Sequence, residues 1–411
     1  MNTYLIIILF TLVGEFVIQS AARILNLRAL SDTLPAEFAG YYDQEKYLES
    51  QAYTKANGRL GMVSSTFSMV VVVSFILLGG FNHVDLWARG FGLGELSTGL
   101  IFFGVLFVLS DLLSLPFSLY GTFSIEERFG FNKMSIATYF TDKLKSYLLV
   151  GVFGAPLLGA ILYFFQVAGD LAWLWAWLIV SAFILVLPPI FTTFIAPLFN
   201  KFEPLQDGEL KDALSAYASK VDFPLTGVFV MDGSKRSGHS NAYFSGFGKN
   251  KRIALYDTLV EKHSVTELVA ILAHEIGHYK KKHIVVGTAM TIVQLGVLFG
   301  ILSLFISEPA LFNAFGVETV SAYAGLVFFS LLYSPISFLL GIAQNAWSRR
   351  NEFEADAFAA QTLGTSEGLI EGLKTLSVAN LGNLTPHRLT VFLNYTHPPI
   401  LTRIERLAEI G

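Results

Sequence analysis

The chain has 411 residues, of which 53% are hydrophobic and only 15% are charged, and its mean hydropathy is +0.55. Soluble proteins carry roughly 25% charged residues, so this composition excludes a soluble globular protein and predicts an integral membrane protein. The absence of cysteine excludes disulfides, thiol nucleophiles and thiolate metal ligands, and a net charge of −4 with a pI near 6.1 offers no basic surface for nucleic acid.

Seven apolar runs are long enough to cross a bilayer, which takes about 20 mostly apolar residues per helix. In chain order they are residues 4–22, 62–80, 96–119, 147–168, 171–199, 284–306 and 322–344. The first run is long and no positive charge precedes it, so we expect it to remain as a helix and not to be cleaved as a signal peptide. The pattern predicts a mainly α, polytopic membrane protein with seven transmembrane helices.

The basic residues predict how these helices are oriented. Lys and Arg are enriched on cytoplasmic flanks, and 27 of the 28 fall on one side of the seven-span arrangement, with Arg89 on the other. We therefore expect the N-terminus outside and the polar segments in the cytoplasm. The membrane would be the inner membrane of a bacterial cell or the endoplasmic reticulum of a eukaryotic one.

The spans divide the chain into four parts. Residues 1–199 hold helices one to five, 200–283 form a first cytoplasmic segment, 284–344 hold helices six and seven, and 345–411 form a second cytoplasmic segment. The two polar segments together have the size of one ordinary domain. Their patterns predict, in chain order, a helix after Gln206, a strand at 226–231, a hairpin around 248–251, and helices at 265–282, 346–362, 366–377 and 400–408. We expect a single α+β domain built from both segments.

The predicted helix at 265–282 contains the sequence His274-Glu275-Ile276-Gly277-His278, an H-E-x-x-H pattern. Residues four apart share a helical face, so both imidazoles can reach one metal ion while Glu275 is aimed at water bound to that ion. The alternative is a pair of surface histidines near the basic end of a helix. An apolar turn before His274 favours burial and hence the metal site.

A catalytic zinc takes three protein ligands, and the acidic helix at 346–362 offers candidates for the third. Glu352 and Asp356 are four residues apart and share a face, whereas Glu354 lies about 200° away from Glu352 around the helix. One geometric solution makes Glu352 the ligand with Asp356 behind it, and Glu354 fits neither role. The alternative is a solvated charged face beside Arg349 and Arg350.

Four motifs together resemble those of the type I CaaX prenyl endopeptidases, which are seven-helix membrane zinc metalloproteases. The motifs are H-E-I-G-H at 274–278, N-E-F-E-A-D-A at 351–357, G-H-S-N-A-Y-F-S-G-F-G at 238–248 and N-Y-T-H-P-P at 394–399. The resemblance extends over essentially the whole chain in order and spacing. It implies one zinc ion per chain, with His274, His278 and Glu352 as its ligands.

The resemblance also implies roles for residues around the metal. Glu275 is the general base, Asp356 is a supporting or proton-donating carboxylate, and Asn241 and His397 hold the substrate backbone and the developing oxyanion. From the residues alone, His397 is an ordinary loop histidine before two prolines, and the segment around Asn241 is an ordinary hairpin strand. We assign no role to His239 or His283, nor to the remaining histidines at 83, 263 and 387.

The implied function is removal of the last three residues of isoprenylated CaaX proteins, at the cytoplasmic face. A prenylated peptide or protein and the lipid bilayer are then the partners, and the oligomeric state stays open. A quality-control protease for membrane proteins would use the same chemistry on other substrates. A transporter is a hypothesis from another class, suggested by Glu15 and Asp111 inside predicted spans, but no inverted repeat supports it.

Overall fold

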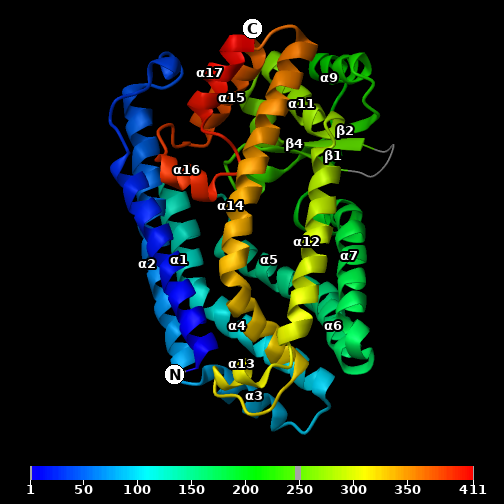
Figure 1. Ribbon diagram of the computed structural model, residues 1–411. Helices are drawn as coiled ribbons and strands as arrows, with labels where there is room; N and C mark the ends of the chain where they lie inside the picture. The colour runs from blue at the N-terminus through cyan, green and yellow to red at the C-terminus, as the bar shows by residue number, and fades with distance from the viewer. Residues whose placement is uncertain (1, 246–250, 411) are drawn as a thin grey trace.

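The computed structural model describes residues 2–245 and 251–410 and contains two regions, a bundle of long helices and a smaller mixed domain (Figure 1). In this part of the chain, seven helical stretches are long and apolar enough to cross a membrane. Their bounds are Thr3–Arg28, Gln44–Leu77, Glu95–Glu126, Ile136–Val167, Gly169–Phe199, His283–Phe305 and Ala322–Leu363. The predicted fold class, mainly helical with seven candidate spans, is confirmed.

Several of these stretches combine consecutive helical elements. The first two are single helices, α1 (Thr3–Arg28) and α2 (Gln44–Leu77), as are α12 (His283–Phe305) and α14 (Ala322–Leu363). The others pass through short π-helical turns: α4 (Glu95–Tyr120) continues into Gly121–Glu126, α5 (Ile136–Leu149) joins α6 (Ala155–Val167), and α7 (Ala172–Ile190) leads to α8 (Ala196–Phe199). The short helices α3 (Gly80–Arg89) and α13 (Pro309–Asn313) lie at the end of the bundle that carries the N-terminus (Figure 1).

Two helices extend well beyond the apolar runs that predicted them. The α2 helix begins at Gln44, where the side chain of Asp43 caps it by accepting a hydrogen bond from the backbone N–H of Lys46. The helix expected at 346–362 is not separate from the seventh span, because both belong to the single helix α14. Hydropathy falls at Gln344, but no glycine or proline follows until Gly364, so the backbone has no reason to leave the helix there. The predicted boundary therefore marks a change of polarity and not the end of a helix.

The mixed domain contains a four-stranded sheet in the order β1-β2-β4-β3. The strand β1 (Phe202–Pro204) is antiparallel to β2 (Leu225–Met231), β2 is parallel to β4 (Lys251–Tyr256), and β3 (Ala242–Ser245) is antiparallel to β4. The order leaves β3 at an edge of the sheet. The turn expected near Gly248 lies outside the described residues.

Six helices complete this domain, and both chain segments contribute to it. They are α9 (Glu209–Lys220), α10 (Asp257–Lys262), α11 (Val265–Lys280), α15 (Glu367–Ala379), α16 (Arg388–Asn394) and α17 (Ile400–Ile410). One buried cluster unites side chains from the sheet, α9, α11, α14, α15 and α17. The segments before and after helices α12 and α14 therefore share a single hydrophobic core.

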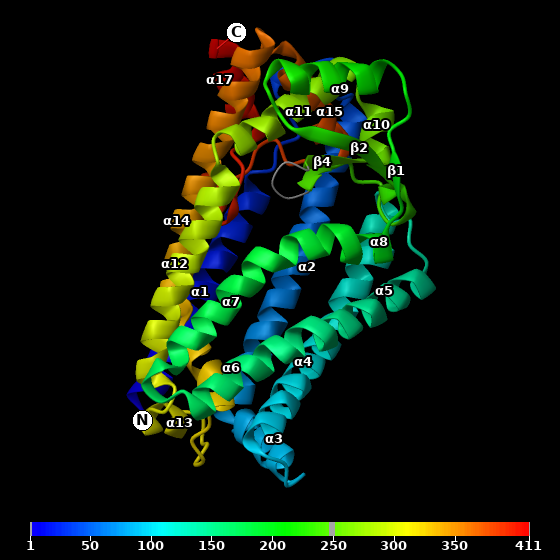
Figure 2. The ribbon, with the colours of Figure 1, turned by 90° about the vertical axis from the view of Figure 1, so that its right-hand side faces the viewer.

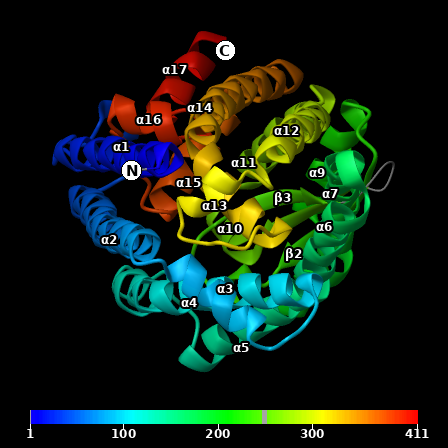
Figure 3. The same ribbon diagram turned by 60° about the horizontal axis from the view of Figure 1, so that its bottom comes forward.

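The mixed domain lies at the end of the bundle opposite the N-terminus, and the C-terminus lies within it (Figure 2). Seen from the N-terminal end, the long helices stand around the rim while the sheet, α11 and α15 lie behind the middle of the ring (Figure 3). Helices α12 and α14 connect the two regions directly. This arrangement holds the domain core against one end of the bundle.

The two acidic residues inside predicted spans have different surroundings. Asp111 on α4 pairs with Lys143 on α5, with 2.6 Å between Oδ1 and Nζ, and accepts a short hydrogen bond from the hydroxyl of Tyr147. Glu15 on α1 borders a cavity of about 510 Å³ that is otherwise lined by side chains of α12 and α14. The charge of Asp111 is therefore compensated by a neighbouring span.

Candidate metal centre

The helix α11 begins with a capping box that fixes its first turn. The hydroxyl of Ser264 accepts a hydrogen bond from the backbone N–H of Glu267, and the Glu267 carboxylate accepts one from the backbone N–H of Ser264. The other carboxylate oxygen of Glu267 accepts a hydrogen bond from Thr375 on α15. These bonds anchor the helix that carries His274 and His278 against the C-terminal segment.

Three possible ligand groups converge where α11 crosses α14. The Nε2 atoms of His274 and His278 lie 3.2 Å apart. Glu352 approaches from α14, with Oε2 3.4 Å from Nε2 of His274 and Oε1 3.2 Å from Nε2 of His278. One ligand atom from each of the three residues can be chosen so that all lie within 4.8 Å of one another. The structure therefore brings together the three residues that the sequence predicted as metal ligands.

The site is buried, and its chemistry suits a divalent cation. His274 is 7% exposed and Glu352 is 4% exposed. Oε2 of Glu352 is buried and accepts no hydrogen bond from the described residues, although such a carboxylate oxygen needs a partner. Two imidazole nitrogens and one carboxylate are a common ligand set for catalytic zinc. The residues present fit a metal ion at this position.

A close approach of two helices makes this convergence possible. A Cβ atom added at Gly277 would lie 3.0 Å from both Cα and the carbonyl oxygen of Ala355, which is tighter than ordinary van der Waals contact. Gly277 and Ala355 therefore let α11 and α14 pack with their backbones almost touching. Larger residues at either position would separate the imidazoles from Glu352.

Asp356 and Arg403 support one side of the site. Oδ1 of Asp356 lies 2.8 Å from Nδ1 of His274, which is the ring nitrogen that faces away from Glu352. The guanidinium of Arg403 on α17 donates to both oxygens of Asp356, at 2.8 and 2.6 Å, and its Nη1 lies 3.4 Å from Oε2 of Glu352. The buried arginine thus connects the two carboxylates.

These contacts shift the proton affinity of the two buried basic groups. Burial alone would lower the pKa of His274, but its contacts with Asp356 and Glu352 outweigh that effect and raise the pKa to about 9. Burial also acts to lower the pKa of Arg403, and the same carboxylates hold it above its ordinary value. A metal ion that binds His274 at neutral pH must therefore displace a proton.

Sequence reasoning missed Arg403, although a signal was present. Arg403 occupies the same face of the C-terminal helix as the apolar residues Ile400, Ile404 and Leu407, following the spacing i, i+3, i+4 and i+7. A charged residue in an apolar stripe must find a buried partner. The sequence does not show which acid that partner is.

Removal of Arg403 should destabilise the protein strongly. In Arg403→Met, the carboxylates of Asp356 and Glu352 stay buried without their cation, and breaking such a buried pair costs about 3–5 kcal/mol. We expect a clear drop in the melting temperature in detergent, and a larger one after treatment with a chelator. Glu405→Met is the matched control, since that exposed charged residue lies on the same helix and its replacement should change stability little. Equal melting temperatures for Arg403→Met and the wild type would contradict this account.

The other predicted site residues lie at different distances from the ligands. Glu275 follows His274 on α11 and is half-buried. Nε2 of His397 lies 3.5 Å from Oε1 of Glu352, and the His397 side chain is 65% exposed. Asn241 lies immediately before the edge strand β3, where its side chain accepts a hydrogen bond from the backbone N–H of Ala242. Within residues 2–245 and 251–410, no hydrogen bond or ion pair joins Asn241 to the ligands.

Two histidines without a predicted role have specific partners. Nδ1 of His283 lies 3.0 Å from Nδ1 of His278, and Nε2 of His283 lies 3.3 Å from Oε2 of Glu354. His239 stacks on Phe131 with 3.9 Å between the ring centroids, and its Nε2 lies 3.1 Å from Glu126 at the end of the third span. The sequence assigned no role to His283 and made Glu354 neither the ligand nor its support, and the structure places His283 against the ligand His278 and Glu354 against His283.

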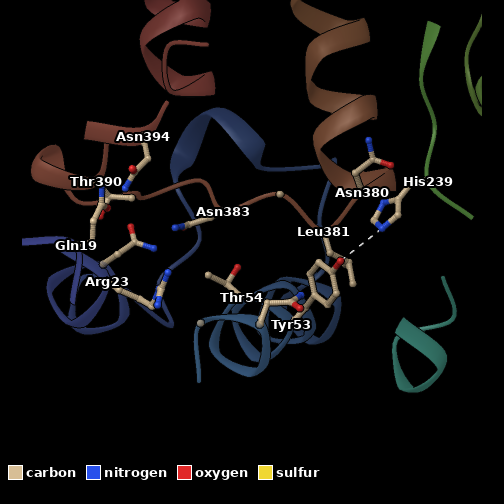
Figure 4. A pocket seen from close by; sticks show the side chains of 14 residues that line it. Gln19, Arg23, Tyr53, Thr54, His239, Asn380, Leu381, Asn383, Thr390 and Asn394 are labelled. Atoms are coloured by element: carbon tan, nitrogen blue, oxygen red, sulfur yellow. Dashed lines mark hydrogen bonds between the residues drawn. The ribbon is translucent and has the colours of Figure 1, made fainter. Parts of the chain in front are cut away.

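A second polar feature lies between the bundle and the C-terminal segment. It is a cavity of about 450 Å³ bounded by α1, α2, α16, the loop after α15 and His239 (Figure 4). Figure 4 shows Arg23 and Gln19 on one side and Tyr53 with His239 on the other, and the hydroxyl of Tyr53 lies 3.4 Å from Nε2 of His239. None of the three ligand residues lines this cavity, so it is separate from the metal centre.

Comparisons with known proteins identify the family of this chain. A family model described as CAAX prenyl protease N-terminal, five membrane helices, matches residues 23–201, and the model of peptidase family M48 matches residues 204–411. CAAX prenyl protease 1 homologues are 36% identical in Arabidopsis thaliana, over 93% of both chains, and 34% identical in Homo sapiens, over 91% of this chain and 88% of that one. The crystal structure of S. mikatae Ste24p has a TM-score of 0.94 and 31% identity, and the match covers 99% of each chain. The predicted resemblance is confirmed, and the chain belongs to peptidase family M48 and, within it, to the CAAX prenyl proteases.

Proposed function

We propose that this protein is a zinc endopeptidase of the membrane that removes the C-terminal tripeptide from isoprenylated CaaX proteins. The observation that carries the proposal is the convergence of His274, His278 and Glu352 within 4.8 Å, with Glu275 beside them on α11. The relatives are named CAAX prenyl proteases, and this chain matches most of their length, which supports the choice of substrate. We propose one zinc ion per chain, because His274, His278 and Glu352 together supply the three protein ligands of one catalytic zinc site.

The residues of the site have distinct parts in the proposed reaction. A zinc ion held by His274, His278 and Glu352 would polarise the scissile carbonyl and would lower the pKa of the attacking water to about 7. Glu275 accepts the proton of that water as its oxygen forms the new bond to the carbonyl carbon, and then delivers the proton to the leaving amine as the C–N bond breaks. Asp356, held by Arg403, keeps Nε2 of His274 turned toward the metal by bonding to Nδ1.

Substrate binding is proposed for the edge strand and for the segment before α17. An extended peptide can add to the edge of a sheet through main-chain hydrogen bonds, and β3 is the last strand of the sheet, next to Asn241. His397 is exposed and lies 3.5 Å from Glu352, within reach of a substrate carbonyl. We propose that Asn241 and His397 hold the substrate backbone and stabilise the developing oxyanion.

We also propose an orientation in the membrane. The bias of Lys and Arg favours an N-terminus outside and a metal centre on the cytoplasmic side. The partners are then the bilayer and a lipid-modified peptide, with no role for nucleic acid. A quality-control protease remains the second candidate, because the metal chemistry is indifferent to whether the peptide carries a lipid.

A pair of peptides separates these two functions. We expect purified protein in liposomes to cleave a farnesylated CaaX peptide with a kcat/KM at least ~10-fold above that of the unprenylated peptide, because each buried CH₂ of the lipid contributes about 0.8 kcal/mol to binding. A peptide bearing a straight alkyl chain of equal hydrophobicity controls for simple partitioning into the bilayer. Equal cleavage of farnesylated and bare peptides would instead favour quality control, and cleavage of neither would contradict both.

A further inference from the structure

The second imidazole ligand, His278, has its own support on the side away from the metal. Its Nε2 faces His274 and Glu352, while its Nδ1 lies 3.0 Å from Nδ1 of His283. His283 is the first residue of α12 and is only 8% exposed. The positive φ of 60° at Lys282 turns the chain sharply between α11 and α12 and brings the ring of His283 against that of His278.

With Nε2 of His278 on a metal ion, only one assignment of donors and acceptors is possible from His278 through His283 to Glu354. A histidine that gives the lone pair of Nε2 to a metal carries its proton on Nδ1, so His278 must be the donor to His283. Nδ1 of His283 is then the acceptor, and its proton lies on Nε2, which donates to Oε2 of Glu354 at 3.3 Å. The other oxygen of Glu354 accepts from Nε of Arg350 at 3.0 Å. Every bond in this series has a consistent donor and acceptor.

The first imidazole ligand, His274, is held by a similar series of contacts. Nδ1 of His274 faces Asp356, which is held by Arg403, just as Nδ1 of His278 faces His283, which is held by Glu354 and Arg350. The two series differ in length and burial. Asp356 and Arg403 are buried, whereas the side chain of Glu354 is 39% exposed and that of Arg350 is 77% exposed. Of the three residues behind His278, His283 is therefore the buried one.

We propose that His283, oriented by Glu354, is a positioning residue that fixes the tautomer and ring orientation of His278 and thereby helps to retain the zinc ion. The inference rests on the proposed zinc centre. His283 lies behind His278, on the side away from His274 and Glu352, so its effect should appear first in metal affinity and only then in turnover. Partners of this kind typically change metal affinity or activity by about 10–100-fold when removed.

Zinc retention by full-length protein tests this role without reference to peptidase activity. Purified variants in detergent are dialysed against a series of buffered free zinc concentrations, and bound zinc per chain is measured by mass spectrometry. We expect His283→Ala and His283→Leu to bind zinc about 10–100-fold more weakly than the wild type. His283→Asn should lie between them and the wild type, because its Oδ1 takes the place of Nδ1 as an acceptor. His83→Ala, at the far end of the bundle on α3, is the control and should bind zinc like the wild type.

A double variant tests whether Glu354 acts through His283. We expect Glu354→Ala alone to weaken zinc binding by less than His283→Ala does, and the double variant to bind zinc as His283→Ala alone does within about a factor of two. Added free zinc should restore peptidase activity to His283→Ala but not to Glu275→Gln. Multiplicative losses in the double variant would show two independent effects and would overturn the proposed series.

The remaining outcomes separate failure of this inference from failure of the proposed function. Wild-type protein that binds no zinc would refute the zinc centre itself. Wild-type binding of one zinc, together with equal binding by His283→Ala and His283→Leu, would refute only the positioning role. Equal loss in His283→Ala, His283→Leu and His283→Asn, with all variants eluting as monodisperse folded protein, would also refute it, because the acceptor atom would then be irrelevant.

Discussion

Glu275→Gln is expected to lower kcat/KM for peptide cleavage by about 10⁴-fold while one zinc ion per chain remains bound. Glutamine has the same shape as glutamate, but it cannot accept the proton of the attacking water or return it to the leaving amine. Because the proposed mechanism uses Glu275 for both transfers, the loss should reach the upper end of the range for general acid–base catalysis. Peptide cleavage and zinc content are measured on the same preparation.

The control for this experiment is Glu261→Gln, which removes an exposed carboxylate from α10 near the start of α11 and should leave cleavage unchanged. Persistent cleavage by Glu275→Gln would contradict the metalloprotease assignment. Loss of both cleavage and zinc would show that Glu275 maintains the site and does not simply transfer protons. Transport as the primary activity would become untenable if cleavage were lost and zinc retained.

Glu352→Ala should abolish zinc binding under conditions in which the wild type holds one ion per chain, and cleavage should be lost with it. The variant removes one of three protein ligands and leaves two imidazoles, which cannot complete the ligand set of a catalytic zinc. Glu354→Ala should retain most of its zinc at saturating concentration, because Glu354 contacts His283 and Arg350 and not the ligand atoms. Metal analysis of both variants after dialysis gives the comparison.

The pair forms a sharp test because both residues are glutamates two positions apart on α14. Their faces differ by about 200°, and their side chains differ in exposure, at 5% for Glu352 and 39% for Glu354. A loss of zinc in Glu354→Ala with retention in Glu352→Ala would mean that the ligand lies on the other face of the helix. The argument from helical faces would then be wrong.

Local patterns predicted those parts of the site that lie within one helix. The spacing of His274 and His278 places both rings on one face, and the same rule selects Glu352 with Asp356 over Glu354. Sequence patterns also predicted all seven spans, since each needs a continuous apolar run. These features depend on residues a few positions apart, where the backbone geometry fixes the outcome.

Contacts between distant elements could not be predicted in this way. Arg403 reaches His274 across 129 positions, and its place beside Asp356 depends on how α17 packs against α11 and α14. His283 was invisible for another reason, because its contact with His278 depends on the positive φ at Lys282, where no glycine marked the turn. The hydropathy pattern divided α14 into a span ending at residue 344 and a separate helix at 346–362, because hydropathy reflects the surroundings of a helix and not where its backbone ends.

The ligand-bearing helices are attached to the bilayer in unequal ways. Glu352 belongs to the same unbroken helix as the seventh span, about 45 Å from its start at about 1.5 Å per residue, whereas a turn at Lys282 separates α11 from the sixth span. Spans respond to a thicker or thinner bilayer by tilting. A tilt of the seventh span would displace Glu352 with α14, and because Gly277 and Ala355 hold α11 against α14, α11 would have to follow through the turn at Lys282. We therefore expect the thickness of the host membrane to influence how the mixed domain is oriented on the bundle more than the spacing of His274, His278 and Glu352.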